Sequence, residues 1–221
     1  MPKGHVMRSS YAATARYVAA GVVVAVVAAG CSGSHSQRAS SSSAPEPVVN
    51  AAFVRAFMIG PPTSESGTSP VLSPEAGEVR AGGASAFVVF SPPSVSPECI
   101  GHAELSVEGT PQGGDPLRAY PSWPSYAADA TPGAAIGPET LMDNRPTAVS
   151  QTSNPDGQAA LDVTDLARAW WKDRILPSQR QTVSEGAPLV MALTTGNTTV
   201  WHIRVDAGHE PQLRVTASCP H

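Results

Sequence analysis

The chain has 221 residues, a formal net charge of −4, and 19 Gly and 22 Pro. Nucleic-acid binding needs a basic face, and the charge balance of this chain gives none, so we exclude that class of partner. The many short apolar runs separated by Pro, Gly, Ser and Asn predict an all-β domain rather than a helical one.

Residues 1–30 have the pattern of a secretory signal peptide. A basic start without acidic residues precedes an apolar run over 18–30, which is shorter than the ~20 apolar residues of a membrane span. The segment Ala28-Ala29-Gly30-Cys31 resembles the lipobox of bacterial lipoproteins, in which the cysteine receives a diacylglycerol and the chain is cut before it. The resemblance implies lipidation of Cys31 and anchoring at the extracytoplasmic face of the cell membrane. The alternative is a secreted protein in which Cys31 is a bystander.

Residues 31–47 are rich in Ser, sparse in charge and end in two prolines. Such a composition cannot bury enough apolar surface to fold, so we expect a flexible tether between the lipid and a folded domain. Removal of the leader takes away Lys3, Arg8 and Arg16 and no acidic residue. This leaves 11 Lys and Arg against 18 Asp and Glu, a net charge of −7.

A single β domain is expected over residues 48–219. Strands are predicted over 51–59, 86–91, 102–108 and 117–120. The second of these is apolar on both faces, which is typical of a strand covered on both sides. The third alternates apolar and polar residues, which is typical of a strand with one face in the core.

The remaining two cysteines, Cys99 and Cys219, are expected to form a disulfide, because thiols outside the cytoplasm tend to oxidise. Each cysteine continues the apolar parity of a neighbouring strand, so both thiols are predicted to point into the core. Two free buried thiols are the alternative.

The segment LDVTDLARAWWKD predicts a short helix over 165–172, with Thr164 as its N-cap. Three strands are expected after it, within PLVMALTT, TVWHIRV and PQLRVTASC. Turn signals separate these strands, so they are predicted to form an antiparallel meander.

The long irregular stretch over 121–158 is the expected place for a binding surface, because loops of this length are usually functional or disordered. Exposed aromatic rings suit stacking on a sugar, and the candidates here are Tyr120, Trp123, Tyr126 and Trp171. The alternative is that Trp123 closes one end of the core. Trp170 and Trp201 are assigned to the core.

The order of FVVFSPP, CIGHAELSVEG, LDVTDLARAWW and PQLRVTAS resembles the DNRLRE domain family over about residues 49–219. The resemblance implies a jelly-roll β-sandwich, a fold that occurs in extracellular bacterial proteins and includes carbohydrate-binding modules. The predicted fold class is therefore an antiparallel, jelly-roll-like β-sandwich with one short helix.

No catalytic motif is evident: the chain has no nucleophile elbow, no zinc-protease helix motif and no carboxylate pair at a recognisable spacing. A metal is not expected at the cluster of His202, Asp206, His209 and Glu210, and no cofactor is expected. We predict a non-catalytic, lipid-anchored binding or adhesion module, with polysaccharide as the candidate ligand. The alternatives are a structural lipoprotein that binds another envelope protein and, after it, an unrecognised hydrolase.

Overall fold

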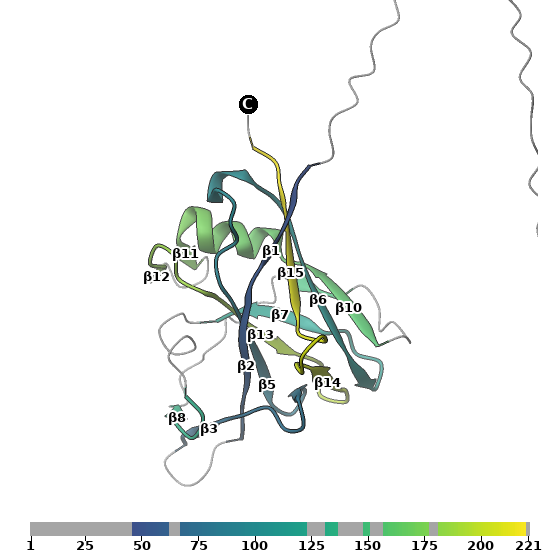
Figure 1. The fold of residues 1–221 in the computed structure, drawn as a ribbon. Helices are drawn as coiled ribbons and strands as arrows, with labels where there is room; N and C mark the ends of the chain where they lie inside the picture. The colour runs from purple at the N-terminus through teal and green to yellow at the C-terminus, as the bar shows by residue number, and fades with distance from the viewer. Residues whose placement is uncertain are drawn as a thin grey trace, which may run out of the picture. The chain divides into compact units, whose positions relative to one another are not determined.

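A computed structural model of the chain describes residues 46–61, 67–122, 131–136, 148–150, 157–176 and 181–219. Two antiparallel sheets form a β-sandwich, as the sequence predicts (Figure 1). From β4 (Glu78–Ala81) through β5 (Ser85–Phe90) and β6 (Ile100–Gln112) to β7 (Arg118–Pro121), successive strands alternate between the two sheets. The later strands β10 (Gln158–Asp162), β13 (Leu189–Thr194) and β14 (Val200–Arg204) alternate in the same way. This alternation is the jelly-roll-like arrangement.

The first sheet is built around the long strand β6 (Ile100–Gln112). Strand β10 (Gln158–Asp162) pairs with β6, and β15 (Gln212–Ala217) and β14 (Val200–Arg204) also pair with it. The outer strands are β1 (Val48–Ala51), which pairs with β15, and β4 (Glu78–Ala81), which pairs with β14.

The second sheet has seven strands among the described residues. Their order is β8 (Ala135–Ile136), β3 (Ser69–Leu72), β2 (Phe53–Ile59), β5 (Ser85–Phe90), β13 (Leu189–Thr194), β7 (Arg118–Pro121) and β9 (Ala148–Val149). A separate small pair consists of β11 (Ile175–Leu176) and β12 (Gln181–Thr182).

The strand predicted over 51–59 is two strands in two sheets. The chain leaves the first sheet after Ala51 and enters the second at Phe53, so the break falls at Ala52. Arg55, which interrupts the apolar pattern of β2, places its guanidinium carbon 5.4 Å from the centre of the Phe57 ring. A cation over an aromatic face explains how a charged residue fits this otherwise apolar surface.

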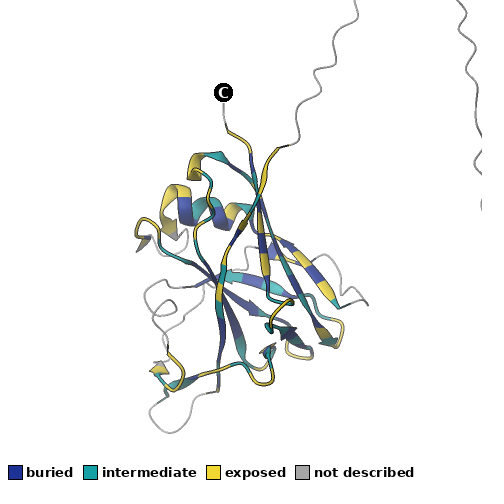
Figure 2. Cartoon of the chain, viewed as in Figure 1, coloured by how far each residue is buried: buried dark blue, intermediate teal, exposed yellow. Residues whose placement is uncertain are grey.

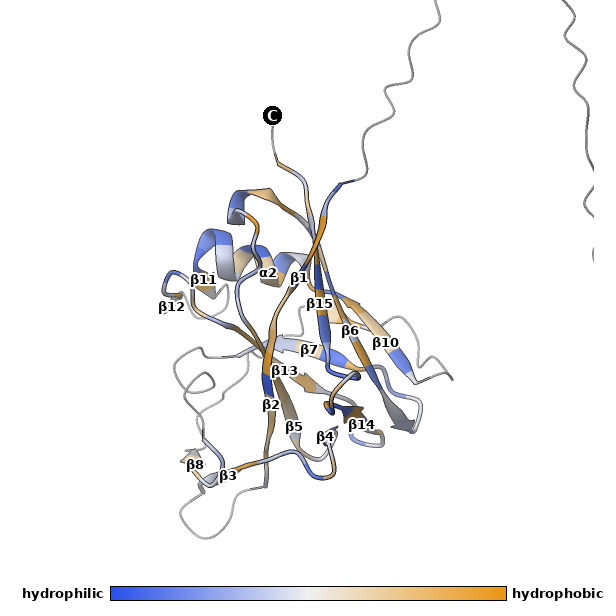
Figure 3. Ribbon diagram, in the orientation of Figure 1, coloured by the Kyte–Doolittle hydropathy of each residue, from blue (hydrophilic) through white to orange (hydrophobic). Residues whose placement is uncertain are grey.

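The core joins the buried faces of both sheets (Figure 2). Strands β5 and β13 are the most apolar segments of the second sheet (Figure 3). Five consecutive residues in each of them are buried, from Ala86 to Phe90 and from Leu189 to Leu193. The prediction that 86–91 is covered on both faces is thereby confirmed.

The meander predicted for the C-terminal strands is wrong. Strand β13 belongs to the second sheet, whereas β14 and β15 both pair antiparallel with β6 and so run in the same direction. The turn signals marked the ends of the strands correctly. They do not specify which distant strand each one pairs with.

The predicted helix is present as α2 (Thr164–Ala167), which continues as a wider, π-helical segment η2 (Arg168–Asp173). Thr164 is the first helical residue and not the N-cap: its backbone N–H donates to Asp162 Oδ1 at 3.0 Å. Arg168 holds the helix to the start of β6, because it donates to the carbonyl oxygens of Ile100 and Gly101 at 2.9 and 2.6 Å.

Cys99 and Cys219 form the predicted disulfide, which links residues 120 positions apart. The bond lies at the surface, not in the core: Cys219 is exposed and Cys99 half-buried. The predicted inward orientation fails because strand alternation reaches neither residue. Cys99 ends the short 3-10 turn η1 (Pro97–Cys99), and Cys219 lies beyond β15, after a register shift between Thr216 and Ala217.

Candidate functional site

The outward face of the first sheet is polar where β10, β6 and β15 lie side by side. Glu104 stands opposite Asp162 on one neighbouring strand and Arg214 on the other. In the next row along β6, Ser106 stands opposite Ala160 and Gln212. Because alternate residues of a strand share a face, these side chains all project from the side opposite the core.

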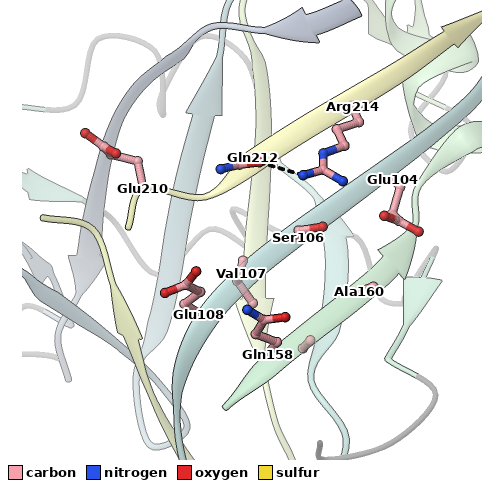
Figure 4. Close-up of a pocket in the computed structure, with 10 residues that line it drawn as sticks. Glu104, Ser106, Val107, Glu108, Gln158, Ala160, Glu210, Gln212 and Arg214 are labelled. Carbon is pink, nitrogen blue, oxygen red and sulfur yellow. Dashed lines mark hydrogen bonds between the residues drawn. The ribbon is translucent and has the colours of Figure 1, made fainter. Parts of the chain in front are cut away.

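This face is hollowed into an open groove of about 460 Å³. Figure 4 shows its lining side chains on all three strands and on the loop before β15. The hollow exists because the small side chains of Ser106 and Ala160 lie opposite each other between longer ones. The lining residues are Glu104, Ser106, Val107, Glu108, Gln158, Ala159, Ala160, Glu210, Gln212 and Arg214.

A second hollow of about 290 Å³ continues the groove along β6. It shares Glu108 and Gln158 with the first and extends past Gly109 to Pro111. From Glu104 to Pro111 the strand advances about 24 Å at its usual rise per residue. The combined groove is therefore long and shallow, which suits an extended ligand better than a compact one.

Most of the polar groups that line the groove have few protein partners. Arg214 donates to Gln212 Oε1 at 3.2 Å (Figure 4). Glu104 forms no ion pair with the described residues, and Glu108 lies 4.0 Å from Nε2 of His209. Glu210 Oε2 accepts from the Gly208 N–H at 2.8 Å. These contacts leave hydrogen-bonding capacity on each side chain for a ligand that enters the groove.

The loop between β14 and β15 is braced from within. Arg204 donates to both carboxylate oxygens of Asp206, at 3.2 and 2.9 Å, and His209 Nδ1 lies 3.2 Å from the same carboxylate. The hydrogen bond from Arg204 is the main reason that the pKa of Asp206 is lowered. This bracing fixes the loop that brings Glu210 to the rim of the groove.

At the other end of the face, Asp162, Thr164 and His102 form a small polar cluster. The Thr164 hydroxyl donates to Asp162 Oδ1 at 2.5 Å, accepts from the Ala103 N–H at 2.9 Å, and lies 3.0 Å from His102 Nδ1. Hydrogen bonds from Thr164 lower the pKa of Asp162. A catalytic triad has the histidine between the hydroxyl and the carboxylate. Here the hydroxyl is central, so the cluster is suited to holding the start of α2 against β6.

Of the four aromatic residues proposed from sequence as a ligand surface, the structure describes Tyr120 and Trp171. Trp171 is only 6% exposed and its indole nitrogen donates to the Ala187 carbonyl at 3.3 Å, so its assignment to a ligand surface is corrected to the core. Tyr120 is half-buried on the second sheet and packs against the core. Trp123 and Tyr126 lie outside the described residues, as does Cys31. Trp170 and Trp201 are buried, as predicted.

The sequence does not mark the groove residues as a site, because aromatic rings in a long loop are its more prominent binding signal. Their signal was present in the outward parity of 102–108 and of PQLRVTAS. What the sequence lacked was the pairing that places β10 and β15 on either side of β6.

No protein-family model matches the chain, and no curated protein matches it. Within the described ranges, no helix is long and apolar enough to cross a membrane. No group of three or more His, Cys, Asp or Glu side chains in the same ranges is placed to hold a metal ion.

Proposed function

We propose that this protein is an exported, lipid-anchored binding module that holds a polysaccharide in the groove over β10, β6 and β15. The observation that carries the proposal is the open, polar groove of about 460 Å³ on the outward face of three adjacent strands. Side chains on strands keep their positions better than side chains on loops, so the groove is preorganised for binding.

The chemistry of the lining favours a hydroxyl-rich ligand. A carboxamide both donates and accepts hydrogen bonds, as a sugar hydroxyl does, and Gln158 and Gln212 lie on opposite sides of β6. Ser106 adds a hydroxyl between them. The length of the groove, about 24 Å along the strand, fits several units of a linear chain.

The carboxylate positions support binding rather than hydrolysis. Glu104 and Glu108 are four residues apart on one strand, about 14 Å at the usual rise, whereas glycosidases hold their two carboxyl groups about 5–9.5 Å apart. Asp162 is nearer to Glu104, but its carboxylate accepts hydrogen bonds from the N–H and hydroxyl of Thr164, which hold it at the start of α2. Release of reducing ends from a bound polysaccharide would favour the hydrolase alternative.

The anchoring half of the proposal rests on the lipobox-like sequence before Cys31 and the Ser-rich segment after it. A tether would present the binding face away from the membrane. The Cys31→Ala variant is expected to leave the membrane fraction or to accumulate unprocessed. Unchanged processing and membrane retention would refute lipid anchoring.

The groove is tested by filling it. The Ser106→Trp variant places a large ring over the hollow, and Thr216→Trp makes a similar change on the same face outside the lining. In pull-down with insoluble polysaccharides and on a glycan array, we expect the wild type and Thr216→Trp to bind and Ser106→Trp not to bind. Equal binding by the wild type and both variants would place the binding site outside the groove. Failure of the wild type to bind any glycan would refute the proposed function. A single dominant protein neighbour in crosslinked membranes would then favour the partner-binding alternative.

A further inference from the structure

The charges along the groove are unbalanced. Three glutamates line it, Glu104, Glu108 and Glu210, and among the described residues Arg214 is the one cation in the lining of the larger hollow. Arg204, which borders the second hollow, is engaged by Asp206 through two hydrogen bonds. Among the described residues, the lining of the groove therefore carries more negative than positive charge, and His209 lies 4.0 Å from Glu108 at its edge.

The sheet also places two like charges directly opposite each other. Asp162 and Glu104 are register partners on β10 and β6, and like charges in this position destabilise a sheet. His102 adds a contact to Asp162 at 3.7 Å between Nδ1 and Oδ1. Thr164 holds Asp162 through two hydrogen bonds, and Arg214 stands opposite Glu104 on β15. Glu104 forms no ion pair with the described residues, so its carboxylate keeps the capacity to pair with a charged ligand.

The spacing of the glutamates indicates what kind of cation fits. Glu104 and Glu108 are about 14 Å apart along β6, so they cannot converge on one metal ion. A polymer that carries positive charges at intervals could instead pair with Glu104 and Glu108 separately. Between them lie the hydroxyl and carboxamide groups of Ser106, Gln158 and Gln212. Among the described residues, the apolar lining of the larger hollow consists of Val107 and two alanines, which gives little for the side chains of a peptide to pack against.

We propose that the ligand of this groove is a polysaccharide that carries free amino groups. Its ammonium groups pair with Glu104 and Glu108, and its hydroxyls bind Ser106, Gln158 and Gln212. This inference rests on the proposed function and narrows it to one class of glycan.

The test uses the purified full-length chain and calorimetric titration at pH about 5.5, where glutamates are ionised. The probes are a glucosamine oligomer, an N-acetylglucosamine oligomer of the same length, a uronic acid oligomer and oligolysine. We expect the glucosamine oligomer to bind at least about tenfold more tightly than its acetylated counterpart, since hydrogen bonds to charged groups are the stronger ones. The uronic acid oligomer is expected to bind most weakly.

Two variants localise the effect. Glu104→Gln combined with Glu108→Gln keeps the shape of the groove and is expected to remove the tenfold preference. Glu185→Gln is the matched control, because Glu185 pairs with Arg174 away from the groove. Added salt should lower the affinity of the wild type for the glucosamine oligomer towards that of the double variant.

The outcomes separate the two proposals. Equal affinity for both sugar oligomers, lost in Ser106→Trp, would overturn the amino-glycan inference and keep the polysaccharide site. Oligolysine binding as tight as the glucosamine oligomer would overturn the glycan class in favour of a basic peptide. Failure to bind any glycan, in titration and in pull-down, would overturn both the inference and the proposed function.

Discussion

The disulfide between Cys99 and Cys219 should contribute a large part of the stability of this domain. It closes a loop of 120 residues, and the chain-entropy relation gives about 16 cal/mol/K for a loop of that size, or about 4.9 kcal/mol at 25 °C. The bond lies at the surface, so its loss removes little packing. Backbone hydrogen bonds from Ser218 to Cys99 and from Ala217 to Pro47, at 2.7 and 2.8 Å, keep the end of β15 in place without it.

The perturbation is the double variant Cys99→Ser with Cys219→Ser, measured by urea unfolding. We expect the free energy of unfolding to fall by about 4–5 kcal/mol, the midpoint of thermal unfolding by about 10–20 °C, and the urea m-value to rise, because an unlinked unfolded chain exposes more surface. Ser218→Ala, which leaves the crosslink intact, is the control. A loss below about 1 kcal/mol with an unchanged m-value would refute the reasoning, because it would mean that the crosslink does not restrict the unfolded chain.

Three further changes test the packing and electrostatics. Gly82→Ala should lower the free energy of unfolding by about 3 kcal/mol or more, because Gly82 has a φ of +116° and an added Cβ would overlap the carbonyl oxygen of Thr199. Gly83→Ala, at a φ of +68° in open space, should cost only about 1 kcal/mol. Trp201→Phe should change the free energy of unfolding by less than about 1 kcal/mol. The buried indole N–H of Trp201 has no hydrogen-bond partner in the described structure, so the loss of this N–H offsets the cost of the lost side-chain volume. Hydrogen bonds from Thr198 and Thr199 hold the pKa of Asp115 below its ordinary value of 3.8. The stability that this carboxylate contributes is therefore present above pH 3.8 and is lost as the pH falls through the folded-state pKa. The Asp115→Asn variant should therefore be less stable at neutral pH and show a shallower loss of stability below about pH 4, as measured by urea unfolding across pH.

Each of these predictions has a contrary result. Equal costs for the two glycine variants would mean that the loop at Gly82 can move away from the added methyl group. A loss above about 2 kcal/mol in Trp201→Phe would indicate that the indole N–H has a partner after all. An unchanged acid profile in Asp115→Asn would show that the two threonine hydroxyls bind this carboxylate no better than water does.

Local pattern was sufficient where a feature depends on neighbouring residues. The alternation in 102–108 and in PQLRVTAS identified the core faces of β6 and β15, and the unbroken apolar run in β5 identified a strand covered on both sides. The helix at LDVTDLARAWW followed from its spacing and its polar start. Counting cysteines outside the expected leader was enough to pair Cys99 with Cys219.

Partners far apart in the chain were decided only by the tertiary structure. Alternation of apolar and polar residues indicates which face of a strand is buried. No local sequence pattern indicates that β14 and β15 both pair with β6 or that β10 belongs to the same sheet. The surface position of the disulfide depended on a register shift at the end of β15, which the sequence does not mark. Trp171 is in the core because the widened turn of η2 directs it there with Trp170, and both indoles donate to the same carbonyl of Ala187. The groove has the same origin. Its residues come from three segments separated by dozens of positions in the sequence. Hydrogen bonding between strands brings these segments together, so the spacing of residues along the sequence does not predict the groove.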